Sequence, residues 1–188
     1  MNKLLLIIAL FTINCKAQNT IINLTETDQH NLNMMNGDLY MKDINNIMLP
    51  YIGTWKWVNG SKEMILTLLK QTKYHYTGSV FNYFEDRIVG HYVYKENGII
   101  KADTSNDDIN AEYGVNVNFT LDPYSEISSI SFYDYLKHKN YDVRLELISP
   151  TQIKFHGKED TDITKYRRGT HTIYPGTTFP LEMTFTKQ

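Results

Sequence analysis

Apolar and polar residues alternate in short runs along most of the chain, and the first clear run begins near residue 51. Its apolar face consists of Tyr51, Gly53, Trp55 and Trp57. A period of two predicts a β-strand with one buried face, because successive side chains of a strand point to opposite sides. Asn59-Gly60 follows, and this dipeptide readily adopts the positive φ angles of a tight hairpin turn. The region is therefore predicted to open with a β-hairpin.

The same alternation returns at short intervals towards the end of the chain, with a second hairpin signal at Asn97-Gly98. The apolar positions of the later runs are Met64, Leu66, Leu68, Ile88, Gly90, Tyr92, Tyr94, Val115, Val117, Phe119, Leu121, Ile130, Phe132, Val143, Leu145, Leu147, Ile153, Phe155, Met183 and Phe185. Short strands joined by turns form a sandwich or a barrel, and sequential hairpins close most simply by up-and-down pairing. We therefore predict an all-β fold, an antiparallel up-and-down barrel of about eight or nine strands.

The part of the chain before residue 51 lacks this alternation. Residues 18–42 show neither a strand period nor a helix period, and we interpret them as an extended, partly packed lead-in. Residues 43–49 place apolar side chains at helical spacing behind Asp43, a suitable cap, and Pro50 limits their continuation. We expect a short helix there, at the start of a single β-barrel domain that spans residues 43–188.

The first 17 residues have the features of a secretory signal. Lys3 precedes the apolar run of residues 4–11, and small or polar residues follow up to Ala17. The apolar run would be only about 12 Å long as a helix, whereas about 20 residues are needed to cross a bilayer. We therefore expect export to the periplasm, the outer-membrane surface or the extracellular space.

Cys15 leaves two routes of processing open. Cleavage after Ala17 would remove it, whereas lipid attachment at Cys15 would make it the protein's link to a membrane. Cys15 is the only cysteine of the sequence. A mature domain therefore has no internal disulfide and depends on burial of its core.

Composition and charge agree with a globular β domain. Hydrophobic residues make up 41% of the 188 residues and aromatic residues 13%, with fourteen tyrosines. Without residues 1–17, which hold two lysines and no acid, the chain keeps 17 basic and 21 acidic side chains, a formal charge of −4. No concentrated basic surface is indicated, so nucleic acid is not an expected partner. We expect a single domain and a monomer.

Gly53-Thr54-Trp55, on the first predicted strand, resembles the opening motif of lipocalin-like (calycin-type) barrels. In that family the tryptophan closes one end of the barrel, and a late arginine stacks over it. The resemblance implies a lipocalin-like barrel with Trp55 at its closed end. Arg144, Arg167 and Arg168 are the candidate partners, and their spacing does not single one out.

A longer resemblance covers most of the chain. Its features are Cys15-Lys16-Ala17-Gln18, Lys42-Asp43-Ile44-Asn45-Asn46, Gly53-Thr54-Trp55-Lys56-Trp57, Asn59-Gly60, the stretch from Gly90 to Gly98, Phe179-Pro180 and Met183-Thr184. Together they resemble a family of uncharacterised exported proteins of Bacteroidetes-type bacteria, a domain of unknown function. The resemblance implies compartment and architecture, and it transfers no activity and no site residue.

Acidic residues are the first candidates for chemistry. They are Glu85-Asp86, Asp160 with Asp162, and the group Asp103, Asp107 and Asp108. The first two sets could supply a carboxylate pair across a cleft, although neighbouring acids in turns are more often simply solvated. The third set lacks the glycine and the glutamate of a calcium loop.

Histidines and nucleophiles give no stronger signal. His75, His91, His138, His156 and His171 are dispersed, and no two of them have the spacing of metal ligands such as i, i+2 or i, i+4. The sequence contains no Gly-x-Ser-x-Gly motif, no glycine-rich phosphate loop and no cysteine after Cys15. We expect no enzyme, no metal and no cofactor.

Aromatic side chains share the predicted inner face of the strands. The residues predicted to bind a ligand are Trp55, Trp57, Tyr92, Tyr94 and Phe132, with Tyr51 beside them. An aromatic wall suits a small apolar or aromatic ligand, and the first hypothesis is a non-enzymatic barrel that binds one. The alternative is that these rings simply fill the core. The protein would then be an interaction module that contacts its partner through outer faces or loops such as Tyr74-His75-Tyr76.

Overall fold

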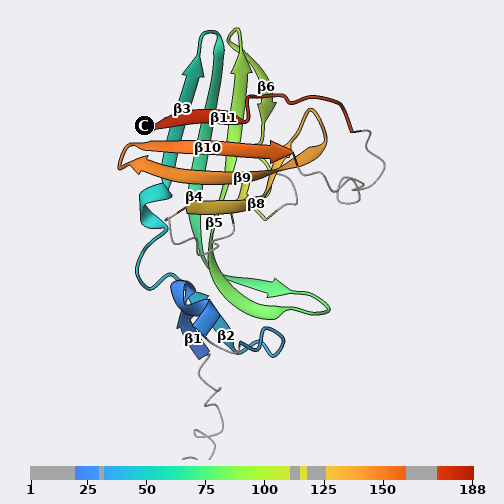
Figure 1. The fold of residues 1–188 in the computed structure, drawn as a ribbon. Helices are drawn as coiled ribbons and strands as arrows, with labels where there is room; N and C mark the ends of the chain where they lie inside the picture. Colours follow the sequence, from blue (N-terminus) through green and yellow to red (C-terminus); the bar gives the residue numbers. More distant parts are fainter. Residues whose placement is uncertain (1–19, 30–31, 111–114, 118–125, 160–172) are drawn as a thin grey trace, which may run out of the picture.

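The computed structural model describes residues 20–29, 32–110, 115–117, 126–159 and 173–188 (Figure 1). These residues contain eleven strands and two short 3₁₀ helices. The strands are β1 (Thr20–Asn23), β2 (Leu39–Lys42), β3 (Gly53–Asn59), β4 (Lys62–Thr77), β5 (Asn82–Glu96), β6 (Ile99–Asp103), β7 (Val115–Val117), β8 (Glu126–Asp134), β9 (Lys139–Ser149), β10 (Gln152–Glu159) and β11 (Glu182–Lys187). The helices are η1 (Leu24–Gln29) and η2 (Leu49–Tyr51). The predicted all-β class is confirmed.

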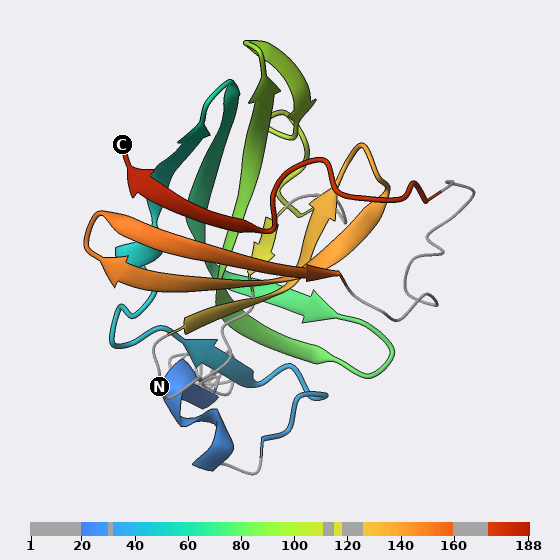
Figure 2. The ribbon, with the colours of Figure 1, turned by 45° about the horizontal axis from the view of Figure 1, so that its top comes forward.

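Consecutive antiparallel pairs build most of the sheet. β3, β4 and β5 form a meander, and β8, β9, β10 and β11 form a second run in which each strand pairs with the next. β11 also pairs with β3, which joins the last strand to the first hairpin. Figures 1 and 2 show β9, β10 and β11 crossing the β3–β4–β5 meander. The apolar side chains of both runs can therefore pack in one core.

The predicted lipocalin-like, up-and-down barrel is not confirmed. The strand order is β1-β2-β5-β4-β3-β11-β10-β9-β8-β7, and the pairs β1–β2 and β2–β5 are parallel. The two ends of the curved sheet meet through β7, which is three residues long and pairs with both β5 and β8. β6 pairs with β5 and lies off this path. The architecture is thus a strongly curved, mixed sheet with β7 as a short bridge.

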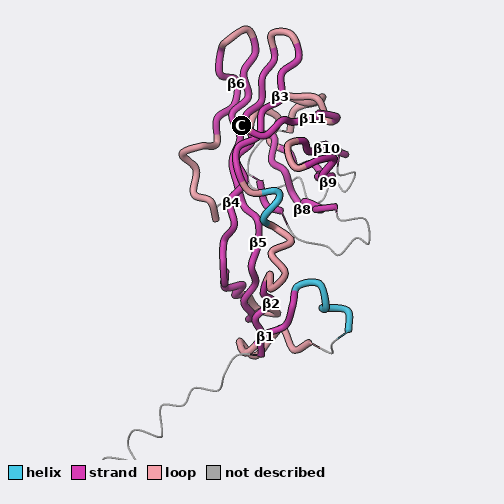
Figure 3. Tube along the Cα trace, turned by 90° about the vertical axis from the view of Figure 1, so that its left-hand side faces the viewer, coloured by secondary structure: helices cyan, strands magenta, loops and turns pink. Residues whose placement is uncertain are grey.

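β4 and β5 are much longer than their neighbours. β3 follows β4 only as far as the pair Gly53 and Leu68, and β7 reaches β5 at Ile88. Beyond these points residues 69–87 form a two-stranded extension, here called the arm, which Figure 3 shows running down to β1 and β2. β2 pairs with β5 on the arm, and β1 pairs with β2. Where the structure describes residues 18–42, they thus contain two strands that join the sheet and the 3₁₀ helix η1.

The predicted helix of residues 43–49 is not formed. Asn46 has a φ of 54°, which lies outside the right-handed helical region, so the chain makes turns and then the short helix η2. Asp43 still caps these turns, because its carboxylate accepts the backbone N–H groups of Ile47 (2.8 Å) and Met48 (3.3 Å). In the described part of the chain, no helix has the length and apolar character that crossing a membrane requires.

The core lies between the two crossing runs of strands. Its largest fully buried side chains are Trp55, Tyr92, Tyr94, Tyr141, Phe132, Phe155, Phe179, Phe185, Met48, Met64, Leu66 and Leu68. Trp55 lies opposite Leu66, and Leu66 lies opposite Tyr92, so the period-two faces of the first strands are confirmed. The predicted core positions outside the described side chains are Val115, Val117, Phe119, Leu121 and Ile130.

Candidate functional site

The five side chains predicted to bind a ligand lie together in the core. They are Trp55, Trp57, Tyr92, Tyr94 and Phe132. The rings of Tyr92 and Phe132 stack with their centroids 4.9 Å apart, and the ring of Phe179, just before β11, packs against both at 5.6 and 5.5 Å. Tyr92, Tyr94 and Phe132 thus pack around Phe179, and aromatic rings occupy the space between these three residues. Trp55 and Trp57 belong to the same buried cluster.

Among the described residues, the cation that lies over Trp55 is a lysine. The Trp55 indole Nε1 donates to the carbonyl oxygen of Tyr51 at 2.8 Å, and Lys187 Nζ lies 5.0 Å from the centre of the Trp55 ring. Arg144, one candidate from the lipocalin resemblance, lines a groove on the outside of β9 and β10. The other candidates, Arg167 and Arg168, lie outside the described residues.

One hydroxyl group in the core lacks a partner. Tyr92 donates its hydroxyl hydrogen to the carbonyl oxygen of Tyr133 at 2.8 Å. The Tyr94 hydroxyl is buried and has no hydrogen bond within the part of the chain that the structure describes. Burial raises the pKa of the Tyr94 hydroxyl, so the group stays a neutral donor. A buried polar atom without a partner is unfavourable and is a place where a ligand or a water could bind.

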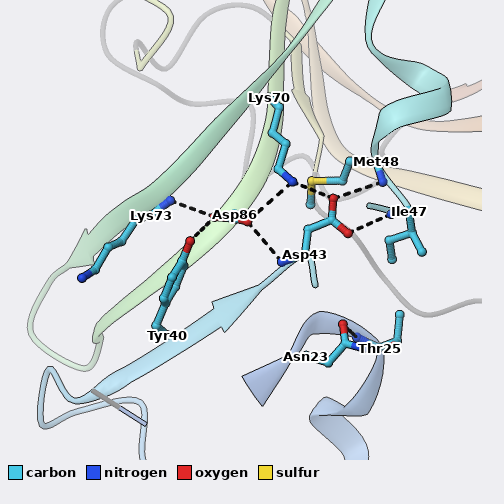
Figure 4. Close-up of polar contacts among 9 residues, drawn as sticks. All are labelled: Asn23, Thr25, Tyr40, Asp43, Ile47, Met48, Lys70, Lys73 and Asp86. Carbon is cyan, nitrogen blue, oxygen red and sulfur yellow. Dashed lines mark hydrogen bonds and ion pairs between the residues drawn. The ribbon is translucent and has the colours of Figure 1, made fainter. Parts of the chain in front are cut away.

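A buried carboxylate cluster joins the lead-in to the arm (Figure 4). Asp86 accepts hydrogen bonds from the Tyr40 hydroxyl (2.6 Å), the Lys73 backbone N–H (2.9 Å) and the Asp43 backbone N–H (3.1 Å). Lys70 Nζ lies 2.8 Å from the Asp43 carboxylate and 3.7 Å from that of Asp86. Every buried charge in this cluster therefore has a partner, which indicates a structural role.

The cluster depends on a β-bulge in β4. Gln71 lies opposite Arg87 and Tyr74 opposite Glu85, so two residues of β4 face the single residue Asp86. Lys73, one of these two, has a φ of 51°, which turns its N–H towards the Asp86 carboxylate. The sequence contains no glycine or other turn signal at this point, so the bulge could not be predicted from it.

Glu85 and Asp86 do not form the carboxylate pair that the sequence allowed. Adjacent residues of a strand point to opposite faces, so Asp86 faces the polar cluster and Glu85 faces the other side of the arm. The second candidate pair, Asp160 and Asp162, lies outside the described residues.

Tyrosine side chains gather on the side of the arm that Glu85 faces. This surface, here called the tyrosine face, consists of Tyr74, Tyr76, Tyr83, Glu85 and Arg87. The rings of Tyr76 and Tyr83 stack with centroids 4.9 Å apart, and Phe81 at the tip of the arm meets Tyr83 edge-on at 6.2 Å. The three tyrosines are half-buried, whereas Phe81 is 50% exposed. A group of aromatic side chains on the surface of a projecting element is typical of an interaction site.

Arg87 is held firmly within this face. Its guanidinium carbon lies 3.3 Å from the centre of the Tyr74 ring, a stacked cation–π contact. Its Nε donates to Gln71 Oε1 at 2.8 Å, and its Nη2 donates to Asn110 Oδ1 at 3.0 Å. The sequence analysis missed Arg87, because its role depends on the register shift at the bulge.

Glu85 is the unusual group of the tyrosine face. It is only 8% exposed, and its carboxylate has no hydrogen bond or ion pair within the described residues. Burial raises the pKa of the Glu85 carboxyl to about 7; the positive charge of Arg87 opposes this shift and the negative charge of Asp86 adds to it. Glu85 therefore changes charge near neutral pH.

The candidate metal sites of the sequence are not assembled. The described histidines lie on the arm (His75), on β5 (His91), in the β8–β9 turn (His138) and on β10 (His156). Among the described residues no group of three histidine, cysteine or acidic side chains is placed to hold a metal ion. Asp103 accepts hydrogen bonds from the Ser105 hydroxyl and from the Ser105 backbone N–H, and these hold the pKa of this carboxyl below its usual range. His171 lies outside the described residues.

Two grooves bounded by described residues lie on the outer surface. A groove of about 440 Å³ is lined by Asp142, Val143, Arg144, His156, Gly157, Lys158 and Glu182. A second, of about 500 Å³, lies between the β3–β4 and β5–β6 turns and is lined by Val58, Gly60, Ser61, Lys62, Glu63, Lys95, Asn97 and Gly98. Both are open to solvent, and neither contains a predicted ligand-binding residue.

A protein family matches the chain over its whole length. The matching family model carries the description of a family of unknown function and covers residues 1–188. No curated protein and no solved structure matches the chain. The predicted resemblance to a domain of unknown function is confirmed, whereas bacterial origin and export remain predictions. The chain belongs to DUF6705, a family of unknown function.

Proposed function

We propose that this chain is an exported, non-enzymatic interaction module that binds a protein partner with the tyrosine face of its arm. The observation that carries the proposal is the cluster of Tyr74, Tyr76, Tyr83 and Arg87 on one side of a projecting hairpin. Tyrosine and arginine are the residue types that contribute most to protein interfaces, because they bury large areas and keep a polar end.

The packing of the core supports this choice over a ligand-binding barrel. Tyr92, Phe132 and Phe179 pack ring against ring in the space where a ligand would lie. Residues 1–17 would serve as the export signal, with either processing route at Cys15, and the protein would act as a monomer. The strongly curved sheet would serve as the rigid support of the arm, with β7 as a short bridge between β5 and β8.

The face of the arm is a better docking surface than its edge. Among the described strands none pairs with the outer edge of β4 between residues 69 and 77. That edge carries the bulge and the positive charges of Lys70 and Lys73, devices that disfavour the addition of a further strand. A partner is therefore expected to lie on the side chains of the tyrosine face.

Photo-cross-linking in the native host tests the proposal. Benzoylphenylalanine replaces Phe81, beside the tyrosine face, and in a matched control it replaces Tyr135, which has nearly the same exposure (50% and 48%). We expect a discrete protein adduct from position 81 and none from position 135. An excess of the protein without benzoylphenylalanine, added as a competitor, should suppress the adduct. The same excess of a Tyr76→Ser, Tyr83→Ser double variant should not suppress it. The same adduct from both positions, or none from position 81, would refute the proposal.

A small apolar ligand inside the core is the second candidate function. The buried Tyr94 hydroxyl without a hydrogen bond favours it, because a ligand with an acceptor group would satisfy that donor. Native mass spectrometry of the protein purified from its host, followed by denaturing mass measurement, separates the two candidates. Extra mass that is lost on denaturation supports the ligand, and a bare mass supports the interaction module.

A further inference from the structure

Glu85 occupies the centre of the tyrosine face. It lies opposite Tyr74 across the β4–β5 pair and between Tyr83 and Arg87 along β5. On the other side of β5 it is in register with Met41 of β2, a buried side chain. Rings and an apolar side chain therefore surround the carboxylate and exclude water from most of it.

The neighbouring cations do not neutralise this carboxylate. Arg87 stacks on Tyr74 and is hydrogen-bonded to Gln71, Asn110 and the Tyr76 side chain. No ion pair joins Arg87 to Glu85 within the described residues, although both are buried. Lys70 is paired with carboxylates on the opposite face of the arm.

A buried carboxylate without a partner is unfavourable, and it becomes favourable when a cation with hydrogen-bond donors reaches it. We propose that the partner of this module presents a lysine or arginine side chain beside the stacked rings of Tyr76 and Tyr83 to pair with Glu85. The outer face of one of these rings would contact the alkyl chain or the charge of the same residue. This inference rests on the proposed function and names the chemistry of the partner.

The pairing would depend on pH in a definite direction. A cation binds the ionised carboxylate, so affinity rises with pH until Glu85 is ionised and is constant above about pH 8. The groups that act on Glu85 are Arg87, Asp86 and the hydroxyls of Tyr76 and Tyr83. Burial raises the pKa values of these two tyrosines, so they stay neutral over the same range. Affinity should therefore fall by up to tenfold per unit below about pH 6.5.

Nuclear magnetic resonance tests the pairing directly on the intact mature chain. The probes are acetyl-Gly-Lys-Gly-amide and the same peptide with norleucine, which has the lysine chain length without the charge. We expect the lysine peptide to shift the ring signals of Tyr76 and Tyr83 and to lower the pKa of the Glu85 carboxyl. The norleucine peptide should bind at least tenfold more weakly.

Two variants complete the test. Glu85→Gln should abolish the preference for lysine over norleucine, whereas Glu96→Gln, at the far end of β5, should retain it. A Glu85 pKa near 4.5 in the free protein, or one near 7 that the lysine peptide does not lower, would overturn the inference. If either result is found while the cross-link from position 81 persists, the arm still binds a partner. Only the proposed pairing of a partner lysine or arginine with Glu85 is then wrong.

Discussion

Neighbouring carboxylates on β5 have opposite surroundings. Asp86 accepts hydrogen bonds from Tyr40, Lys73 and Asp43 and is nearly inaccessible, at 1% exposure. Glu85, the next residue towards the N-terminus, is buried without such donors. Hydrogen bonds to a carboxylate stabilise its charge, and burial without them favours protonation. Replacement of the carboxylate by an amide should therefore have opposite effects on stability at the two positions.

Replacing Asp86 should destabilise the protein. In Asp86→Asn the amide group retains one acceptor oxygen, so a donor among the present partners of Asp86 loses its hydrogen bond, and Lys70 keeps only the Asp43 carboxylate. We expect a loss of about 3 kcal/mol in the free energy of unfolding, measured by urea denaturation at pH 7. Asp107→Asn, at an exposed position, is the control and should leave the midpoint unchanged. Equal effects of both substitutions would contradict the structural role of Asp86.

Replacing Glu85 should stabilise the protein, but only above acidic pH. The carboxyl has a folded-state pKa of about 7 against an ordinary value of 4.5, so its contribution to stability is present below pH 4.5 and is lost as pH rises to 7. As pH rises from 4.5 to 7, the free energy of unfolding of Glu85→Gln should increase by up to about 3 kcal/mol relative to that of the wild type. The difference should persist at pH 8. Urea denaturation at pH 4.5, 6 and 8 measures the difference. A gain that does not change with pH would be inconsistent with a titrating Glu85.

At the scale of elements, β5 connects the core to the arm. It pairs with β4 along its whole length and also with β2, β6 and β7 at successive positions. Gly90 lies where β4 and β7 both contact it, opposite Leu68 and Val115. A glycine inside a strand commonly marks a close approach of another backbone.

Gly90→Ala should disrupt this crossing point. An added Cβ would lie 2.1 Å from the carbonyl oxygen of Thr67, so the β4–β5 pair would have to move apart. We expect a loss of at least about 3 kcal/mol in the free energy of unfolding, because a backbone atom cannot make room as a flexible side chain does. Gly78→Ala, in the turn of the same hairpin, is the control, since nothing lies within 4 Å of its added Cβ. Comparable stability of the two variants would show that the strands are not so closely spaced.

At the scale of the whole molecule, Phe179 closes the core. It comes from the segment that leads into β11 and contacts rings on three other strands, those of Tyr94, Phe132 and Tyr141, at 5.5 to 6.0 Å. The adjoining Thr178 is fixed by Asp134, which accepts its backbone N–H at 2.9 Å. The closing segment is therefore held by a buried hydrogen bond as well as by packing.

Truncating this ring should remove much of the stability without changing the sheet. Phe179→Ala leaves a cavity among rigid rings, and we expect a loss of about 3 to 5 kcal/mol in the free energy of unfolding. Phe81→Ala removes the same atoms from a half-exposed site at the tip of the arm and should cost far less. Thermal and urea denaturation of both variants provide the comparison. Similar losses would mean that Phe179 does not close a filled core.

The sequence by itself determined the β class, the faces of the first strands and the group of buried aromatic residues. These features are local, because the period of two places Trp55, Leu66 and Tyr92 on buried faces whatever the strand order. The sequence also indicated the capping role of Asp43. The expected helix did not form, because the left-handed φ of Asn46 is incompatible with it. The expected barrel relied on hairpins alone and could not include the parallel pairing of β1 and β2 with β5.

Only the tertiary structure decided which surface is a candidate site. The bulge opposite Asp86 sets the register that places Arg87 over Tyr74 and leaves Glu85 without a hydrogen bond or ion pair to any residue that the structure describes. A register shift depends on contacts between segments far apart in the chain, here between Tyr40 or Asp43 and the arm. The packing of Phe179 among the aromatic residues was likewise missed, because the alternating pattern did not include this residue. The register at the bulge and the packing of Phe179 both depend on long-range contacts, which local periodicity does not encode.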